Sequence, residues 1–195
     1  MIRPYALLLA AAALIAAQPS FAAISPQTTK TQAAAPKADP EKDGAAQAVA
    51  IFLNCAHFGG DVAALRNWAA QSGLAEAPPD QATPFLLGKG GKVFGGDTPS
   101  GQLILASEDD GVCSVFAGHA DGKLVLQGFE DWLKQNGFTF SSPHPIHHSG
   151  KGGLTAVSRN YAIHGQGELW HAVITITTGG KSQFEAVLTA YRNKK

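Results

Sequence analysis

The stretch that decides the fold is LTAVSRNYAIHGQGELWHAVITITTGGKSQFEAVLTAY, which runs from Leu154 to Tyr191. Apolar and polar residues alternate in it over three runs, 154–163, 168–178 and 183–191, and glycine-containing turns separate the runs. Alternation with a period of two is typical of a strand with one buried face. The stretch therefore predicts a three-stranded antiparallel meander, with Trp170, Ala172, Ile174 and Ile176 on one face.

The register of the first two strands of this meander stays open. A three-residue turn at Gly165–Gly167 would set Tyr161 opposite His171, and so away from the face that carries Trp170. A shift of one residue moves every side chain of a strand to the other face, so the sequence pattern does not fix this pairing.

Upstream of the meander, the sequence predicts one more hairpin and three helices. The hairpin comprises 102–107 and 112–117, around turn residues 108–111. Helices at about 45–57 and 61–71 form a helical hairpin, and a third is expected at 123–136, with Asp61 and Asp121 as N-caps. Residues 138–141 form a possible short strand, whereas 74–100 and 142–153 are expected to be irregular. The predicted fold is α+β, a mainly antiparallel sheet of about five strands with the helices packed on one face.

The N-terminal region predicts export. Arg3 precedes an apolar run from Ala6 to Ala17, and small residues follow at Ser20 and Ala22. We expect a signal peptide at 1–22, cleaved between Ala22 and Ala23; a retained membrane anchor is the alternative. Residues 23–44, rich in Ala and Pro, are expected to be a disordered tail, followed by a single domain at 45–195. The expected location is the periplasm.

The charge balance bears on the kind of partner. Lys and Arg number 15 and Asp and Glu number 15, and removal of Arg3 with the signal peptide leaves 14 minus 15, or −1. A near-neutral chain lacks the basic footprint of nucleic-acid binding. We expect no nucleic-acid partner and no transmembrane segment after signal cleavage, which leaves an unidentified periplasmic partner.

A histidine-rich segment is the only candidate metal site. His144, His147 and His148 lie close together in sequence, and imidazoles so spaced can share a transition-metal ion. No predicted helix or strand holds the segment, and no carboxylate accompanies it. The favoured interpretation is a solvated loop, and metal binding is the alternative.

The sequence contains no complete motif for covalent catalysis or for phosphate binding. Residues 175–182 approach the P-loop pattern but lie between two predicted strands, where a hairpin turn is expected. Cys55 and His57 are two apart on a predicted helix and so point to opposite sides. Asp109 and Asp110 fit a turn, and the larger aromatic residues have core-facing spacings. We expect a non-catalytic protein without a cofactor.

Several segments carry a family resemblance. They are a helical Cys55, Phe85-Leu86, Gly91-Lys92-Val93-Phe94, Leu103-Ile104-Leu105 and Asp110-Gly111-Val112-Cys113-Ser114-Val115. The chain resembles a family of small uncharacterised secreted proteins of proteobacteria. The resemblance implies export and paired cysteines, and it implies no activity.

Cys55 and Cys113 are expected to form a disulfide. They are the only two cysteines, and the predicted signal peptide leads to an oxidising compartment. Cys113 shares a strand face with Val115 and Ala117, and the helix that carries Cys55 must cover a face of the sheet. The favoured function is binding of a protein or small molecule, at a sheet edge or in the apolar cleft between sheet and helices. The alternative is a metal-binding or metal-dependent protein that uses the histidine segment.

Overall fold

The computed structural model describes residues 39–58, 60–98, 101–165 and 168–192. The predicted signal peptide, its cleavage point between Ala22 and Ala23 and most of the expected tail lie outside these residues.

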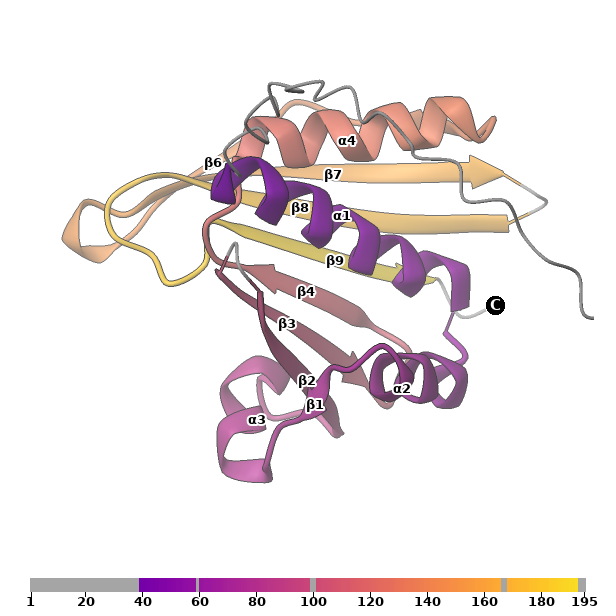
Figure 1. The fold of residues 1–195 in the computed structure, drawn as a ribbon. Helices are drawn as coiled ribbons and strands as arrows, with labels where there is room; N and C mark the ends of the chain where they lie inside the picture. The colour runs from indigo at the N-terminus through magenta and orange to yellow at the C-terminus, as the bar shows by residue number, and fades with distance from the viewer. Residues whose placement is uncertain (1–38, 59, 99–100, 166–167, 193–195) are drawn as a thin grey trace, which may run out of the picture. The chain divides into compact units, whose positions relative to one another are not determined.

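The described residues form an α+β fold built on one large antiparallel sheet (Figure 1). The helices are α1 (Pro40–Phe58), α2 (Val62–Gln71), α3 (Pro79–Leu86) and α4 (Gly122–Gln135), with a short 3₁₀-helix at Lys151–Gly153. The strands are β1 (Ala75–Glu76), β2 (Gly91–Thr98), β3 (Gly101–Glu108), β4 (Cys113–Ala117), β5 (Thr139–Ser141), β6 (Ile146–Ser149), β7 (Thr155–Gly165), β8 (Glu168–Gly179) and β9 (Ala186–Arg192).

The sheet is larger than the sequence predicts. Its strand order is β1-β2-β3-β4-β9-β8-β7-β5, and β6 also pairs with β7, so the described residues give a sheet of 9 strands rather than about five. The two predicted units, the first hairpin and the C-terminal meander, meet where β4 pairs with β9. The additional strands are β1, β2 and β6, which lie in segments expected to be irregular.

Helices cover both faces of the sheet, which corrects the expectation of one covered face. Along β3, Leu103 and Leu105 belong to the core that α1, α2 and α4 bury, whereas Ile104 and Ala106 pack with residues of α3. Alternate residues of a strand point to opposite faces, so α3 lies on the face opposite the other three helices.

Two helices, α1 and α3, have a proline at their first position, where the sequence predicts no helix. Pro40 begins α1, five residues before the expected start, and the backbone N–H of Lys42 donates to the Asp39 carboxylate at 3.4 Å. Pro79 begins α3 in the same way. The first N–H of a helix has no intrahelical acceptor, so proline is tolerated there. Proline therefore begins a helix in a segment whose composition predicts irregular chain.

Glycine likewise makes β2 difficult to predict from the sequence. Gly91 begins this strand and pairs with Glu108 of β3. A Cβ atom at Gly91 would lie 2.6 Å from the Ser107 carbonyl oxygen, so the close approach of the two strands depends on the missing side chain. The residue that weakens the strand pattern in the sequence is the one that lets the strand pair.

The register of the meander differs from that given by a three-residue turn. Gly165 pairs with Glu168, so that Ile163 lies opposite Trp170 and Tyr161 opposite Ala172. Side chains directly opposite each other share a face. The register therefore buries Tyr161 and Ile163, which are 1% and 0% exposed, in the main core.

The Cys55–Cys113 disulfide is present and fastens α1 to β4. The two Cα atoms are 5.7 Å apart, within the usual span of the bond, and both residues are buried. The bridge closes a loop with a sequence separation of 58 residues, which contains α2, α3 and the first strands.

Removal of this bridge should destabilise the protein substantially. The chain-entropy model gives about 4 kcal/mol for a loop of this size. We expect the double variant C55A/C113A to lose stability of this order in urea unfolding. Mass spectrometry of the non-reduced protein, purified from the periplasm of an expression host, checks the bridge itself: two alkylatable thiols would contradict it.

Tyr161 forms the polar contact beneath α4. Its hydroxyl donates to Oε1 of Glu130 at 2.9 Å, and Arg159 lies 3.4 Å from the same oxygen. Burial, and then the hydrogen bond to the Glu130 carboxylate, raise the pKa of the Tyr161 phenol well above its usual value.

This raised pKa predicts a loss of stability in alkali. The folded state holds the Tyr161 proton more tightly than the unfolded chain, so the contribution is complete below a pH of about 10 and is lost as pH rises further. We expect the free energy of unfolding to fall more steeply above that pH in the wild type than in Tyr161→Phe. Equal slopes in urea titrations of the two proteins would contradict the assignment.

Candidate functional site

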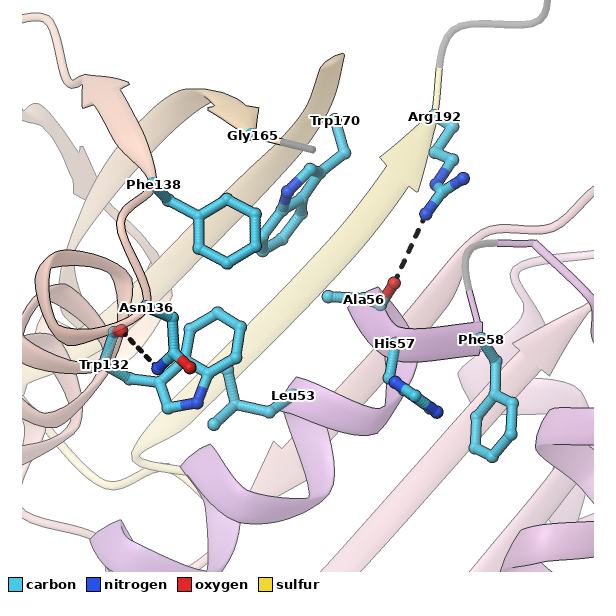
Figure 2. A pocket seen from close by; sticks show the side chains of 10 residues that line it. All are labelled: Leu53, Ala56, His57, Phe58, Trp132, Asn136, Phe138, Gly165, Trp170 and Arg192. Atoms are coloured by element: carbon cyan, nitrogen blue, oxygen red, sulfur yellow. Dashed lines mark hydrogen bonds between the residues drawn. The ribbon is translucent and has the colours of Figure 1, made fainter. Parts of the chain in front are cut away.

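A pocket of about 460 Å³ opens where the C-terminal ends of α1 and α4 meet the end of the sheet (Figure 2). This volume lies within the range of about 300–1,000 Å³ that small-molecule sites occupy. The pocket is lined by Leu53, Ala56, His57, Phe58, Trp132, Asn136, Phe138, Gly165, Trp170 and Arg192. These residues come from segments far apart in the sequence, and only the fold brings them together.

Three aromatic rings form one side of the pocket. Trp132 of α4 stacks on Phe138, with ring centroids 5.3 Å apart and an angle of 22° between the planes. Phe138 in turn meets Trp170 of β8 edge to face, at 6.5 Å and 87°. Aromatic pairs in these arrangements are favourable beyond the area they bury. The rings thus support one another and present a preformed aromatic surface.

The end of α4 explains why Phe138 lies there. Gly137 adopts a φ of +73°, and the backbone N–H of Phe138 donates to the Leu133 carbonyl at 2.9 Å. This is the hydrogen bond of a Schellman motif, in which a left-handed residue ends the helix and turns the chain back. The reversal brings Phe138 against Trp132, one turn earlier on the helix.

Gly165, the last residue of β7, leaves room for this ring. A Cβ atom at Gly165 would overlap the Phe138 side chain, so any larger residue displaces the ring. The position requires glycine for space, and the aromatic surface depends on it.

The other side of the pocket is cationic. Arg192 ends β9 and is paired directly with Trp170 of β8, so the two side chains share a face of the sheet. Nη2 of Arg192 donates to the Ala56 carbonyl at 3.5 Å, near the end of α1, a position that favours a cation. His57 lies at the rim, with its ring 5.1 Å from that of Phe58.

The lining combines aromatic side chains with a few polar ones. The lining residues named above include no Asp, Glu, Ser, Thr or Cys. What the pocket offers is aromatic surface on one side and N–H donors on the other. Ligand sites typically combine apolar walls with a few placed polar groups, whereas most of the surface that lines this pocket is polar.

The histidine segment has a different structure from the expected irregular loop. His147 and His148 lie in β6, which pairs with β7, while His144 precedes the strand and is exposed. Neighbouring residues of a strand point to opposite faces. Nε2 of His148 lies 2.9 Å from the Ser158 hydroxyl. In the described part of the chain, no three His, Cys, Asp or Glu side chains gather closely enough to hold a metal ion.

The remaining sequence candidates have structural roles. Residues 175–179 end β8 and 180–182 begin its connection to β9, so the segment lies between two strands as expected. Asp109 pairs with Arg66 at 2.6 Å, and Asp110 with Lys89 at 3.2 Å. These ion pairs attach α2 and the segment after α3 to the turn of the first hairpin.

The sequence identifies two aromatic residues of the pocket, Trp132 and Trp170, but not their role. Trp170 is 5% exposed and packs as expected, whereas Trp132 is only partly buried and also lines the pocket. Arg192 and Phe138 were missed. Both residues lie at or just beyond the end of a helix or strand. Side chains at such positions often face a gap between the helices and the sheet rather than the core, and this location is a signal that could have identified them.

No family model, curated protein or solved structure matches the chain. Among the described helices, none is both long and apolar enough to span a bilayer. The geometry of the pocket is therefore the main guide to function.

We expect no tight metal binding by the histidine segment, because β6 turns His147 and His148 to opposite faces. Isothermal titration with Zn²⁺ should give no stoichiometric binding that depends on His144, His147 and His148. Tight one-to-one binding that disappears in the variant with all three replaced by alanine would reverse this prediction.

Proposed function

We propose that the protein is exported to the periplasm and acts there as a non-catalytic binding protein. Its binding site is the pocket between α1, α4 and the sheet, and its partner is a small molecule or a side chain of another protein. The observation that carries the proposal is the set of three mutually supporting rings around a cavity of about 460 Å³.

The aromatic surface is costly to leave in water. Trp132 and Phe138 are only partly buried, although both pack against the main core. Covering apolar surface contributes roughly 25 cal/mol for each Å² removed from water. A ligand that covers these rings gains this energy without any rearrangement of them, because their neighbours already hold them in place.

Export is supported by two observations of different kinds. The apolar segment Ala6–Ala17, followed by small residues, has the pattern of a signal peptide. The Cys55–Cys113 disulfide is consistent with an oxidising compartment, since such bonds are rare in reducing ones. The family resemblance points in the same direction.

The test uses a neutral aromatic probe, N-phenyl-1-naphthylamine, whose fluorescence rises in an apolar site. We expect saturable one-to-one binding by the wild type, accompanied by a change in tryptophan emission, because Trp132 and Trp170 line the pocket. Gly165→Ala should weaken binding several-fold, because the added methyl group displaces the Phe138 ring.

Gly150→Ala is the matched control. It adds the same methyl group where the nearest atom, Cβ of Leu154, is 3.4 Å from the new carbon, and where the backbone φ of −114° suits any residue. Binding should be unchanged in this variant. Probe binding that is absent from the wild type, or that is equal in both variants, would count against the pocket as the binding site.

A further inference from the structure

Most of the surface that lines the pocket is polar, although three aromatic rings form one of its walls. Asn136 and His57 contribute an amide and an imidazole, and the amide and the neutral imidazole can each donate and accept hydrogen bonds. The Nδ2 atom of Asn136 donates to the Trp132 carbonyl at 2.9 Å, which holds the amide at the end of α4. A ligand without polar groups would cover the rings and leave this polar surface without partners.

The charges around the pocket offset one another. Arg192 is the only lysine or arginine among the lining residues, and in the described part of the chain no carboxylate joins them. The C-terminal ends of α1 and α4 each carry about half an elementary negative charge, so that together they balance one guanidinium group. Arg192 is also engaged within the protein, since its Nη2 atom donates to the Ala56 carbonyl. The pocket therefore favours neither an anion nor a cation, and an uncharged ligand fits it.

Two of the rings, those of Trp132 and Phe138, offer a flat surface to such a ligand. Their centroids are 5.3 Å apart and their planes are inclined by 22°, whereas carbon atoms in contact lie about 3.5–4.0 Å apart. The two rings are therefore displaced sideways by about 4 Å, and neither fully covers the face of the other. Figure 2 shows them next to each other on one wall of the pocket. The face of an aromatic ring is negative, so it attracts the weakly positive hydrogens of C–H groups.

One class of small molecule combines the properties that this lining requires. A sugar in its six-membered ring form is uncharged, carries hydroxyl groups around its edge and gathers C–H groups on a flat face. Each hydroxyl group can both donate and accept a hydrogen bond, and so can pair with an amide or an imidazole.

We propose that the pocket binds an uncharged sugar ring, whose C–H face lies on Trp132 and Phe138 and whose hydroxyl groups reach the polar groups beside them. This inference rests on the proposed function, since it names the ligand class of the same site. The ligand is either a free sugar or the end residue of a longer saccharide, because both present the same ring.

Fluorine NMR of the protein labelled with 5-fluorotryptophan tests the ligand class. The chain has 3 tryptophans, of which Trp132 and Trp170 line the pocket and Trp68 does not. The probes are the methyl β-glycosides of glucose, galactose and N-acetylglucosamine. We expect at least one of them to shift the resonances of Trp132 and Trp170 in a saturable, one-to-one manner. The Trp68 resonance should shift less, and it serves as the internal reference.

Matched probes test the charge and the shape of the ligand. The uronate and the amino sugar with the configuration of the tightest uncharged probe add one negative or one positive charge to the same ring. We expect each to bind at least about fivefold more weakly, because the pocket offers no net charge to offset the lost hydration. Sorbitol keeps the hydroxyl groups without the ring, and cyclohexylmethanol keeps a ring with a single hydroxyl group. Both should also bind more weakly than the uncharged glycoside.

A pair of variants locates the site. Trp132→Leu removes one ring of the aromatic wall and keeps an apolar side chain, and it should weaken sugar binding about fivefold. Trp68→Leu is the matched control, because Trp68 is also partly buried against the main core but lies outside the pocket. It should bind the sugar as the wild type does. Thermal unfolding checks that both variants fold; if Trp132→Leu does not, the probe series on the wild type still decides the ligand class.

The outcomes separate this inference from the function on which it rests. If the neutral naphthylamine binds but none of the three glycosides does, the pocket binds ligands and the assignment of a sugar is wrong. If neither the naphthylamine nor any glycoside binds, the proposed function fails as well. Binding of a charged analogue or of cyclohexylmethanol at least as tight as that of the glycoside would also overturn the assignment, in favour of an ion or an apolar ligand.

A disaccharide distinguishes the two sources of the ring. The β-linked disaccharide of the tightest uncharged sugar carries the same ring at the end of a chain. Binding at least as tight as that of the methyl glycoside supports the end residue of a saccharide, whereas weaker binding supports a free sugar.

Discussion

The contact on which the rest of the structure depends is made by one ring, that of Phe129 at the middle of α4. This residue is fully buried, and its ring meets Phe52 of α1 at 5.5 Å, Tyr161 of β7 at 5.2 Å and Trp170 of β8 at 6.2 Å. Two helices and two strands are therefore held by a single side chain, and truncation of such a ring typically costs about 3–5 kcal/mol. This contact helps to set the spacing of α1 and α4, which leaves a pocket at their ends.

The pocket is a by-product of how these two helices end. Both helices run across the same face of the sheet. Both end close to the end of the sheet at which β7 ends and β8 begins (Figure 1). At the last turns of these helices, Trp170 and Arg192 line a gap between the helices and the sheet. The Schellman turn at Gly137 fills part of this gap with Phe138, and the remainder is the cavity. A site formed in this way needs no specialised loop.

The sequence predicts the parts of this fold whose pattern is local. Alternation identifies the meander, and the carboxylates of Asp61 and Asp121 cap α2 and α4 as expected. The disulfide was predicted from the presence of two cysteines and of a predicted export signal. Two kinds of feature could not be predicted: elements that contain residues atypical of them, and contacts between residues far apart in the sequence. Pro79 begins a helix and Gly91 begins a strand, although both residue types are typical of irregular chain. Phe138 and Arg192 line the same pocket because of the order of the strands in the sheet, which no local pattern encodes. The pocket depends entirely on contacts between residues far apart in the sequence.

The position of β9 has a consequence for the order of folding. This strand follows all the other described strands in sequence, yet it lies in the middle of the sheet, between β4 and β8. The strands on either side have no hydrogen bonds to each other, so β1–β4 and β5–β8 remain two separate half-sheets until β9 joins them. Pairings between segments far apart in sequence are slow to form. A chain that emerges N-terminus first, from a ribosome or through a membrane, thus has a sheet that stays open along its centre until β9 has emerged and joins the two halves.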